Sequence, residues 1–310
     1  MNNKIIFALF AIIIISGCSQ KENNDSIINR YDLIPSNATK MTPETDIHPP
    51  ILHTDDFENP VPLPFPVNTA GGEDSPFYYN GSLYYFFTPI VNQPLSVQLT
   101  DGATGIYITH KNGTGWTEPV KLALNEPGKL SLDGCEFVIN NTLWFCSARE
   151  GYTGLHWFTS EIINDAAMPA KLVPFPDSYE VGELHIHGNQ LYFHSTRPGG
   201  KGDYDIWIST FADNEWGEPV NVEAVNSEVT DGWPYISSDG LELWFLRWYM
   251  GTPAVMKSVW NGTAWGEPEL IVSQFAGEPT FDEEGNLYFI HHYYNNSVMI
   301  EADIYVAYKR

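Results

Sequence analysis

A repeat of about 50 residues runs through most of the chain and limits it to a small set of folds. The pattern Trp-x-Glu-Pro occurs at positions 116–119, 216–219 and 265–268. An apolar strand centre recurs with similar spacing, at Ile106, Leu155, Ile206, Val255 and Ile304. A single unit of this length cannot bury both of its faces. The units must therefore pack against one another.

Each copy of the repeat also contains a hairpin, in which a turn separates a short apolar strand from a strand rich in Leu and aromatic residues. The turns are expected at Asn80-Gly81, Asn140-Asn141, Gly188-Asn189, Asp239-Gly240 and Glu284-Gly285. Asn-Gly and Asp-Gly favour hairpins because both residues tolerate positive φ. Several short strands per unit are typical of a propeller blade. We therefore predict an all-β fold, a five-bladed β-propeller of four-stranded antiparallel blades.

The last copy reaches Arg310 just after its third strand. A segment near the start of the repeat region, 58–66, resembles an outer strand that has no blade of its own. At one constant offset, Asn68 matches Asn226 and Pro76 matches Pro234. We therefore predict that this N-terminal strand completes the last blade, and that the propeller spans 51–310.

The first residues have the layout of a secretory signal peptide. An apolar run from Ile5 to Ile15 follows one positive charge, and Ser16-Gly17-Cys18 comes next. These residues resemble the lipobox of prokaryotic lipoproteins. The resemblance implies a lipoprotein signal peptide over 1–17 and lipidation of Cys18, with an ordinary signal peptide as the alternative. We expect an extracytoplasmic protein, lipid-anchored to the cell membrane or the outer membrane. Residues 18–50 are expected to form a flexible tether.

The formal net charge of −24 argues against nucleic acid and anionic lipid headgroups as partners. We expect contact with the membrane through the lipid anchor only, and a monomer. No cofactor is predicted, although a structural calcium would suit so acidic a chain. The expected partner is an envelope protein or a glycan.

Two cysteines remain once Cys18 is assigned to the lipid. Cys135 and Cys146 flank the turn at Asn140-Asn141. A two-residue loop there places the two cysteines opposite each other, within reach of a disulfide. We predict this disulfide, with two buried free thiols as the alternative.

The third copy and its exit carry a family likeness. They read LYFHSTRPGGKGDYDIWIS, followed by WGEPVNVEAVNSEVTDGWPYISSDG. This resembles the WD40-like propeller repeat found in TolB and in many envelope proteins. The likeness is strongest over 191–240 and covers 57–310. It implies a propeller fold in an envelope setting and no particular activity.

Acidic residues gather where the first strand of each copy begins, at the expected mouth of a central channel. They are Glu73, Asp74, Asp133, Glu136, Glu180, Glu183, Asp231 and Glu278. The first hairpin is also similar to that of five-bladed glycosidases of the arabinanase and xylosidase type. That likeness implies Asp74 as base, Asp133 as the residue that tunes the acid, and Glu183 as general acid. The alternative is that the acids cap turns or bind Arg149 and Arg197.

Other channel residues suggest binding instead of catalysis. Glu73, Asp231, Trp233 and Glu278 are predicted to contact a ligand, and Trp233 could stack on a sugar ring. His185 and His187 share a strand face with Glu183, but we expect hydrogen-bonded histidines there and predict no metal site. The sequence therefore favours a surface lipoprotein whose propeller is a protein- or glycan-binding platform, with a glycosidase as the alternative.

Overall fold

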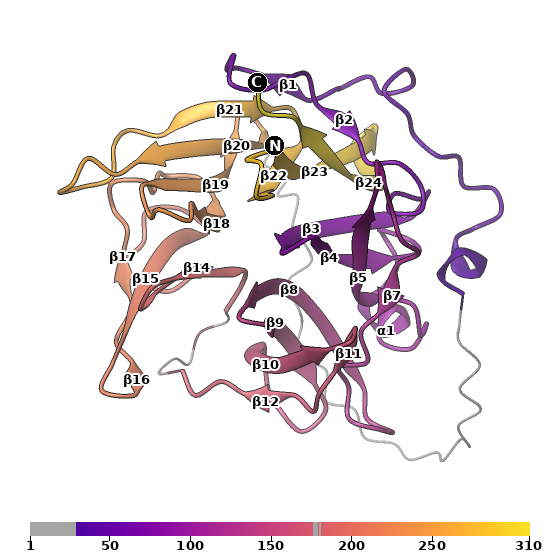
Figure 1. Ribbon diagram of the computed structural model, residues 1–310, viewed down its shortest axis with the longest axis horizontal. Coiled ribbons are helices and arrows are strands. Elements are labelled where there is room, and N and C mark those ends of the chain that lie inside the picture. The colour runs from indigo at the N-terminus through magenta and orange to yellow at the C-terminus, as the bar shows by residue number, and fades with distance from the viewer. Residues whose placement is uncertain (1–28, 176–178, 180) are drawn as a thin grey trace.

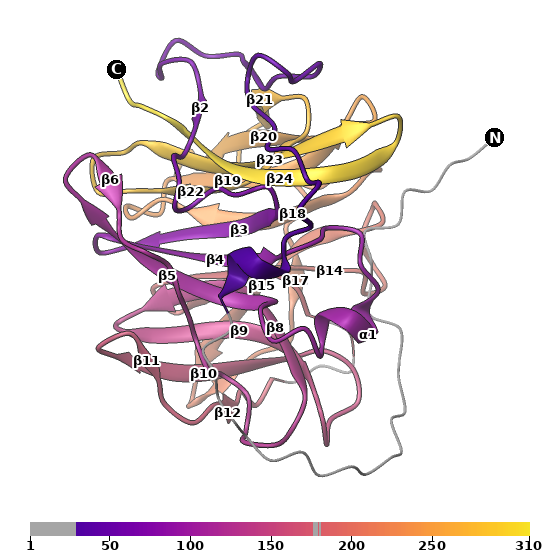
Figure 2. The same cartoon turned by 90° about the vertical axis from the view of Figure 1, so that its right-hand side faces the viewer.

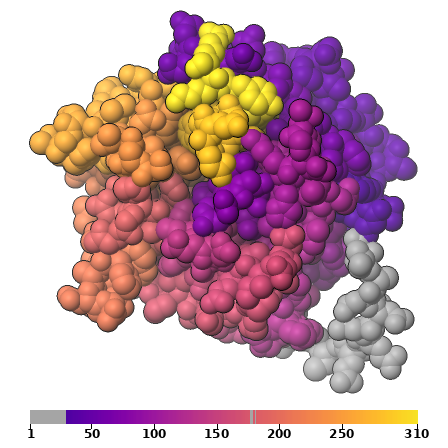
Figure 3. Space-filling view, in the orientation of Figure 1, coloured from indigo at the N-terminus to yellow at the C-terminus, as the bar shows by residue number. Residues whose placement is uncertain are grey.

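The computed structural model describes residues 29–175, 179 and 181–310, and most of their secondary structure is β-strand. The strands form five successive antiparallel meanders within the described residues, which we number I to V in chain order. Figure 1 shows them arranged around a common centre. This arrangement confirms the all-β, propeller-type prediction. In the space-filling view, purple, magenta and gold atoms of meanders I, II and V meet near the centre of this face (Figure 3).

The strand bounds follow the repeat. Meander I contains β3 (Gly72–Tyr79), β4 (Ser82–Thr88), β5 (Gly105–Asn112), β6 (Gly115–Trp116) and β7 (Val120–Lys121). Meander II contains β8 (Ser131–Ile139), β9 (Thr142–Arg149), β10 (His156–Ile163), β11 (Ala166–Ala167) and β12 (Lys171–Leu172). Meander III contains β13 (Leu184–His187), β14 (Gln190–Ser195), β15 (Asp205–Ala212), β16 (Glu215–Trp216) and β17 (Val220–Asn221).

The remaining two meanders are built in the same way. Meander IV contains β18 (Asp231–Ile236), β19 (Glu242–Tyr249), β20 (Thr252–Val259) and β21 (Glu269–Ser273). Meander V contains β22 (Ala276–Phe281), β23 (Leu287–Asn295) and β24 (Val298–Ala307). Outside the meanders lie η1 (Arg30–Leu33), β1 (Ile51–Leu52), β2 (Val61–Pro62) and the short helix α1 (Leu95–Gln98). No helix among the described residues is long and apolar enough to cross a membrane.

The N-terminal strand closes the ring as predicted. β2 pairs antiparallel with β24, with Val61 opposite Val306. A parallel contact between Ala302 of β24 and Gly72 of β3 then joins meander V to meander I. Residues far apart in the sequence therefore share one sheet. The earlier strand β1 adds to the edge of meander IV through β21.

The predicted hairpins and core positions follow from the repeat. The turn residues Asn80, Asn140 and Asn141 all have positive φ, as Asn tolerates. In the second strand of each meander, a Leu and the aromatic residue two positions later are 0% exposed. These equivalent residues are Leu83, Leu143, Leu191, Leu243 and Leu287, and Tyr85, Phe145, Phe193, Phe245 and Phe289. Strand alternation places each pair on one face, where the meanders pack together.

The segment expected to be a flexible tether over 18–50 is instead part of the folded domain from residue 29 onward. Arg30 is only 4% exposed and forms an ion pair with Glu73. Asp46 forms a hydrogen bond with Nε2 of the buried His291, at 2.8 Å. Figure 2 shows this indigo segment running from meander I across meander V. Its polar composition suggested disorder, but its charged side chains are the partners of buried groups in the propeller. Residues 18–28 lie outside the described residues.

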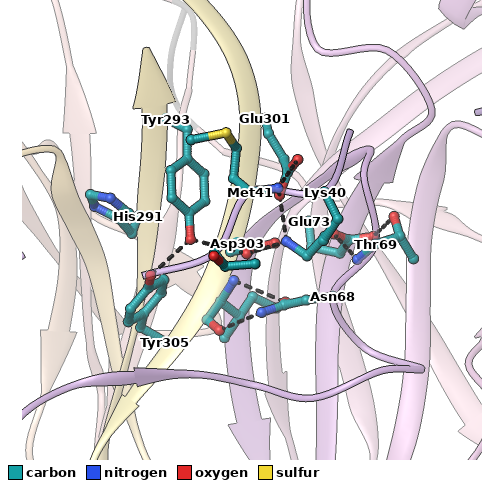
Figure 4. Close-up of polar contacts among 12 residues, drawn as sticks. Lys40, Met41, Asn68, Thr69, Glu73, His291, Tyr293, Glu301, Asp303 and Tyr305 are labelled. Atoms are coloured by element: carbon teal, nitrogen blue, oxygen red, sulfur yellow. Dashed lines mark hydrogen bonds and ion pairs between the residues drawn. The ribbon is translucent and has the colours of Figure 1, made fainter. Parts of the chain in front are cut away.

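Lys40 is the central contact of this segment (Figure 4). Its ammonium group lies between the carboxylates of Glu301 and Asp303 on β24. Burial raises the pKa of Glu301 to about 7 and that of Asp303 to about 6, although Lys40 opposes both shifts. Tyr293 donates to Asp303 at 3.3 Å. The N-terminal segment therefore neutralises charge that the last meander cannot neutralise by itself.

Candidate functional site at the propeller axis

The first strand of four meanders is interrupted at the same point. Register shifts occur between Asp74 and Phe77, Gly134 and Phe137, Gly232 and Tyr235, and Gly277 and Thr280. At each shift one non-glycine residue has left-handed φ: Ser75, Cys135, Trp233 and Glu278. A bulge of this kind re-aims a side chain and is enriched beside functional sites. Glu183 holds the equivalent position in meander III, since it also follows a glycine and precedes β13 by one residue.

These five residues form what we call the axial ring: Ser75, Cys135, Glu183, Trp233 and Glu278. They contact one another across the meanders. Ser75 donates to Glu278 at 2.8 Å, which joins meander I to meander V. The Glu183 carboxyl interacts with Cys135 and Trp233, which contribute to its pKa, and this places meander III beside meanders II and IV. The repeat therefore brings one side chain from each meander to a common site.

Three of the predicted acids lie elsewhere. Glu73, Asp133 and Asp231 are at most 8% exposed, and each binds an arginine. The partners are Arg30 at 3.5 Å, Arg149 at 2.8 Å and Arg247 at 2.6 Å. Asp133 therefore forms a buried ion pair, as do Glu73 and Asp231. The catalytic role of Asp133 and the ligand contacts of Glu73 and Asp231 stay predictions. Desolvated carboxylates require such partners.

Four other acids come together around the axial ring: Asp74, Glu136, Glu183 and Glu278. Burial raises the pKa of Glu183 to about 7, and the neighbouring charge of Asp74 adds to the shift. Burial also raises the pKa of Glu278 and of Glu136 well above the ordinary value, and Asp74 and Glu183 contribute to both. We call these four residues the axial cluster. Glu180, another predicted acid, lies outside the described residues.

The acids of the axial cluster differ from the other acids of the repeat in their partners. Within the described residues, none of its four acids forms an ion pair with Lys or Arg. Its closest partners of basic type are histidines. His194 Nε2 lies 3.3 Å from Glu183 Oε2, and His292 Nε2 lies 3.6 Å from Asp74 Oδ1. The side chains of Asp74 and Glu183 are 30% and 21% exposed, so the cluster is open to solvent on one side.

His194 was not singled out from the sequence, yet it orients Glu183. The backbone N–H of Trp233 donates to His194 Nδ1 at 3.2 Å. Burial lowers the pKa of His194 to about 3, so the ring is neutral and its proton lies on Nε2, facing Glu183. The ring packs so closely on Gly182 that a Cβ there would lie 1.9 Å from Nε2. This contact explains the glycine before Glu183.

The predicted disulfide between Cys135 and Cys146 is not formed. Both are free thiols, and Cys146 lies opposite Gly134 instead of Cys135. Counting outward from the two-residue turn placed Cys135 opposite Cys146. The pairing differs because the bulge on β8 adds residues to that strand. Cys146 instead donates to the carbonyl of Gly182 at 3.2 Å.

The histidine pair on β13 has the hydrogen-bonded role expected of it. The N–H of Ile236 donates to His185 Nδ1, and the ring stacks on Tyr235 with centroids 4.6 Å apart. Among the described residues, no group of three or more His, Cys, Asp and Glu side chains is arranged to hold a metal ion.

Comparisons with known proteins assign this chain to no family. No family model matches, and no curated protein matches. TolB from Acinetobacter baumannii is similar at a TM-score of 0.43 and 12% identity, covering 76% of this chain and 54% of TolB. The GH43 protein BlXynB from Bacillus licheniformis is similar at a TM-score of 0.49 and 12% identity, covering 79% of this chain and 53% of BlXynB. The gluconolactonase XC5397 from Xanthomonas campestris is similar at a TM-score of 0.48 and 12% identity, covering 84% of this chain and 95% of XC5397. Similarity at this level carries no argument about activity.

Proposed function

We propose that this protein binds a glycan at the axial cluster. One observation carries the proposal: four carboxyl groups interact electrostatically near the half-buried Trp233, and no Lys or Arg within the described residues pairs with them. Three other acids of the same repeat do have arginine partners, so the absence of one here is specific to the axis.

The chemistry of the cluster suits a polyhydroxylated ligand. A carboxyl group with a pKa near neutrality both donates and accepts hydrogen bonds, as sugar hydroxyls require. An indole ring offers an apolar face for stacking on a sugar ring. The rigid strands on either side hold these groups in place, which limits the entropy lost on binding.

We expect calorimetry with the full-length protein in mild detergent to detect binding of plant, algal or bacterial oligosaccharides. Trp233→Ala should weaken the binding by about tenfold, which is about 1.4 kcal/mol. Trp260→Ala is the matched control, because Trp260 lies in an outer hairpin against Trp265. Equal affinities of both variants would contradict the proposal. Absence of binding across the panel would direct the search to an envelope protein, by crosslinking on cells.

A glycosidase is the second candidate, favoured by Glu183. A pKa of about 7 keeps this carboxyl partly protonated near neutral pH, as a general acid requires. Asp74 is a second carboxyl in electrostatic contact with it. Mass spectrometry of the same incubations would detect products. Loss of products in Glu183→Gln would support hydrolysis, whereas intact oligosaccharides would leave binding alone.

The location is also a proposal. The lipobox-like residues before Cys18 support an extracytoplasmic lipoprotein, and they lie outside the described residues. We expect the protein to partition into the detergent phase after export in a bacterial host, and Cys18→Ser to move it to the aqueous phase. Detergent partitioning of the Cys18→Ser variant would contradict lipidation at this residue.

A further inference from the structure

Glu136 is the least satisfied acid in the axial cluster. It is 6% exposed, and neither carboxyl oxygen has a hydrogen-bond partner in the part of the chain that the structure describes. A buried polar group without a partner is costly and rare, so each case in a native protein requires an explanation. The neighbouring Asp133 and Arg149 satisfy each other and do not reach Glu136. A missing ligand group is a direct explanation.

The surroundings of Glu136 decide which ligand group would satisfy it. Asp74, Glu183 and Glu278 all interact with it electrostatically. The other titratable groups of the cluster are neutral or poorly basic: Cys135 beside Glu183, and His194, whose pKa burial lowers. His292 faces Asp74 from β23. A site lined by carboxyl groups favours a positively charged ligand group.

A metal ion is a poor candidate for that charge. Calcium takes six to eight oxygen ligands at about 2.3 to 2.6 Å, which requires its acids to converge on one point. The described residues include no such group. An ammonium group instead donates separate hydrogen bonds to acceptors spread over a wider site, and it also interacts favourably with an aromatic face such as that of Trp233.

We propose that the axial cluster binds a sugar carrying a protonated primary amine, with the amine donating to Glu136 and the sugar ring against Trp233. This rests on the proposed glycan function and adds the chemical class of the ligand to it.

Proton release gives the proposal an independent signature. Burial raises the pKa of the Glu136 and Glu278 carboxyl groups well above the ordinary value, so they keep their protons to a higher pH than an exposed carboxyl group does. A cation bound between them would lower those pKa values and expel protons. A neutral sugar would not. Calorimetry in buffers of different ionisation enthalpy measures the number released.

The experiment uses three β-linked tetrasaccharides that differ only at the second carbon of each sugar: glucosamine, N-acetylglucosamine and glucose. Calorimetry is performed with the full-length protein at about pH 6, below the pKa of about 7.7 of an ordinary α-amino group. We expect the glucosamine tetramer to bind at least tenfold tighter than the other two, with proton release. Glu136→Gln should reduce that preference to less than threefold. Glu215→Gln, on the exposed strand β16, should leave it unchanged.

The outcomes separate the two proposals. Equal affinity for all three tetramers would overturn the amine and leave glycan binding intact. If the protein bound none of the three tetramers and no other oligosaccharide tested, both proposals would be overturned. A glucosamine preference that survives Glu136→Gln would also overturn the inference, because attraction to the overall charge of −24 would then explain it.

Discussion

Arg149→Met is expected to lower the free energy of unfolding by about 3 to 5 kcal/mol, the usual cost of removing one partner of a buried ion pair. The side chains of Arg149 and Asp133 are only 5% and 10% exposed. Without the guanidinium, Asp133 keeps hydrogen bonds from Ser131 and Ser147 but loses its counter-charge. For a domain of this size the midpoint of thermal unfolding should fall by roughly 10 °C.

Thermal and urea unfolding of matched variants would test this result. Arg310→Met is the control, because that side chain is 53% exposed and its partner Asp55 is fully exposed. Arg310→Met should leave the midpoint of thermal unfolding unchanged. The double variant Asp133→Asn/Arg149→Met should recover part of the loss, since the buried charge is then gone. A loss below about 1 kcal/mol in Arg149→Met would mean that Asp133 is hydrated, and its predicted role in catalysis would need to be reconsidered.

The fold was predictable because its information is repeated. The Leu and aromatic positions of the second strands recur five times, and each copy supports the others. The closing strand could be found by the same comparison, since Asn68 matches Asn226. In the structure the two asparagine side chains form equivalent hydrogen bonds with the backbone of a third strand. Asn68 bonds to Ile304, and Asn226 bonds to Ile206. A single copy of either pattern would have been ambiguous.

The site was less predictable because two neighbouring positions of the repeat have opposite roles. Asp133 and Asp231 lie two residues before the bulge position and are neutralised by arginines. Trp233 and Glu278 lie at the bulge itself and reach the axis. Sequence spacing shows that acids gather there, but it does not show which side of a bulge each one faces. Aligning copies two to five on the glycine at 134, 182, 232 and 277 would have identified four of the five axial-ring residues; the first copy has Asp74 in place of the glycine.

Arg30→Met is expected to lower the free energy of unfolding by a similar amount, about 3 to 5 kcal/mol, and to release the N-terminal segment. Arg30 donates to the carbonyl of Val67 at 3.1 Å and to the Tyr85 hydroxyl at 3.0 Å. Its guanidinium carbon lies 4.8 Å from the centroid of the Phe87 ring. Methionine can fill part of this volume, but it leaves these acceptors and Glu73 without a donor.

The loss should grow with pH, and the sign follows from Glu73. Burial raises its pKa from 4.5 to about 8, although Arg30 opposes the shift. The proton on the Glu73 carboxyl therefore stabilises the folded protein at low pH. This contribution to the free energy of unfolding is lost as the pH rises from 4.5 through 8. Without Arg30 the pKa rises further, so that loss continues to higher pH. The deficit of Arg30→Met against wild type should be larger at about pH 9 than at about pH 6.

Unfolding at both pH values, together with a trypsin time course, would test the role of Arg30. Cleavage after Lys40 should accelerate in Arg30→Met, because the contact that holds the start of the segment is gone. Arg30→Lys should show an intermediate loss, since an ammonium keeps the charge but lacks the planar fork that reaches several acceptors. Wild-type stability and cleavage in Arg30→Met would mean that residues 29–50 are a tether after all. Slow cleavage in the wild type would instead show that the segment is part of the propeller, because a protease needs the local opening that its ion pairs prevent.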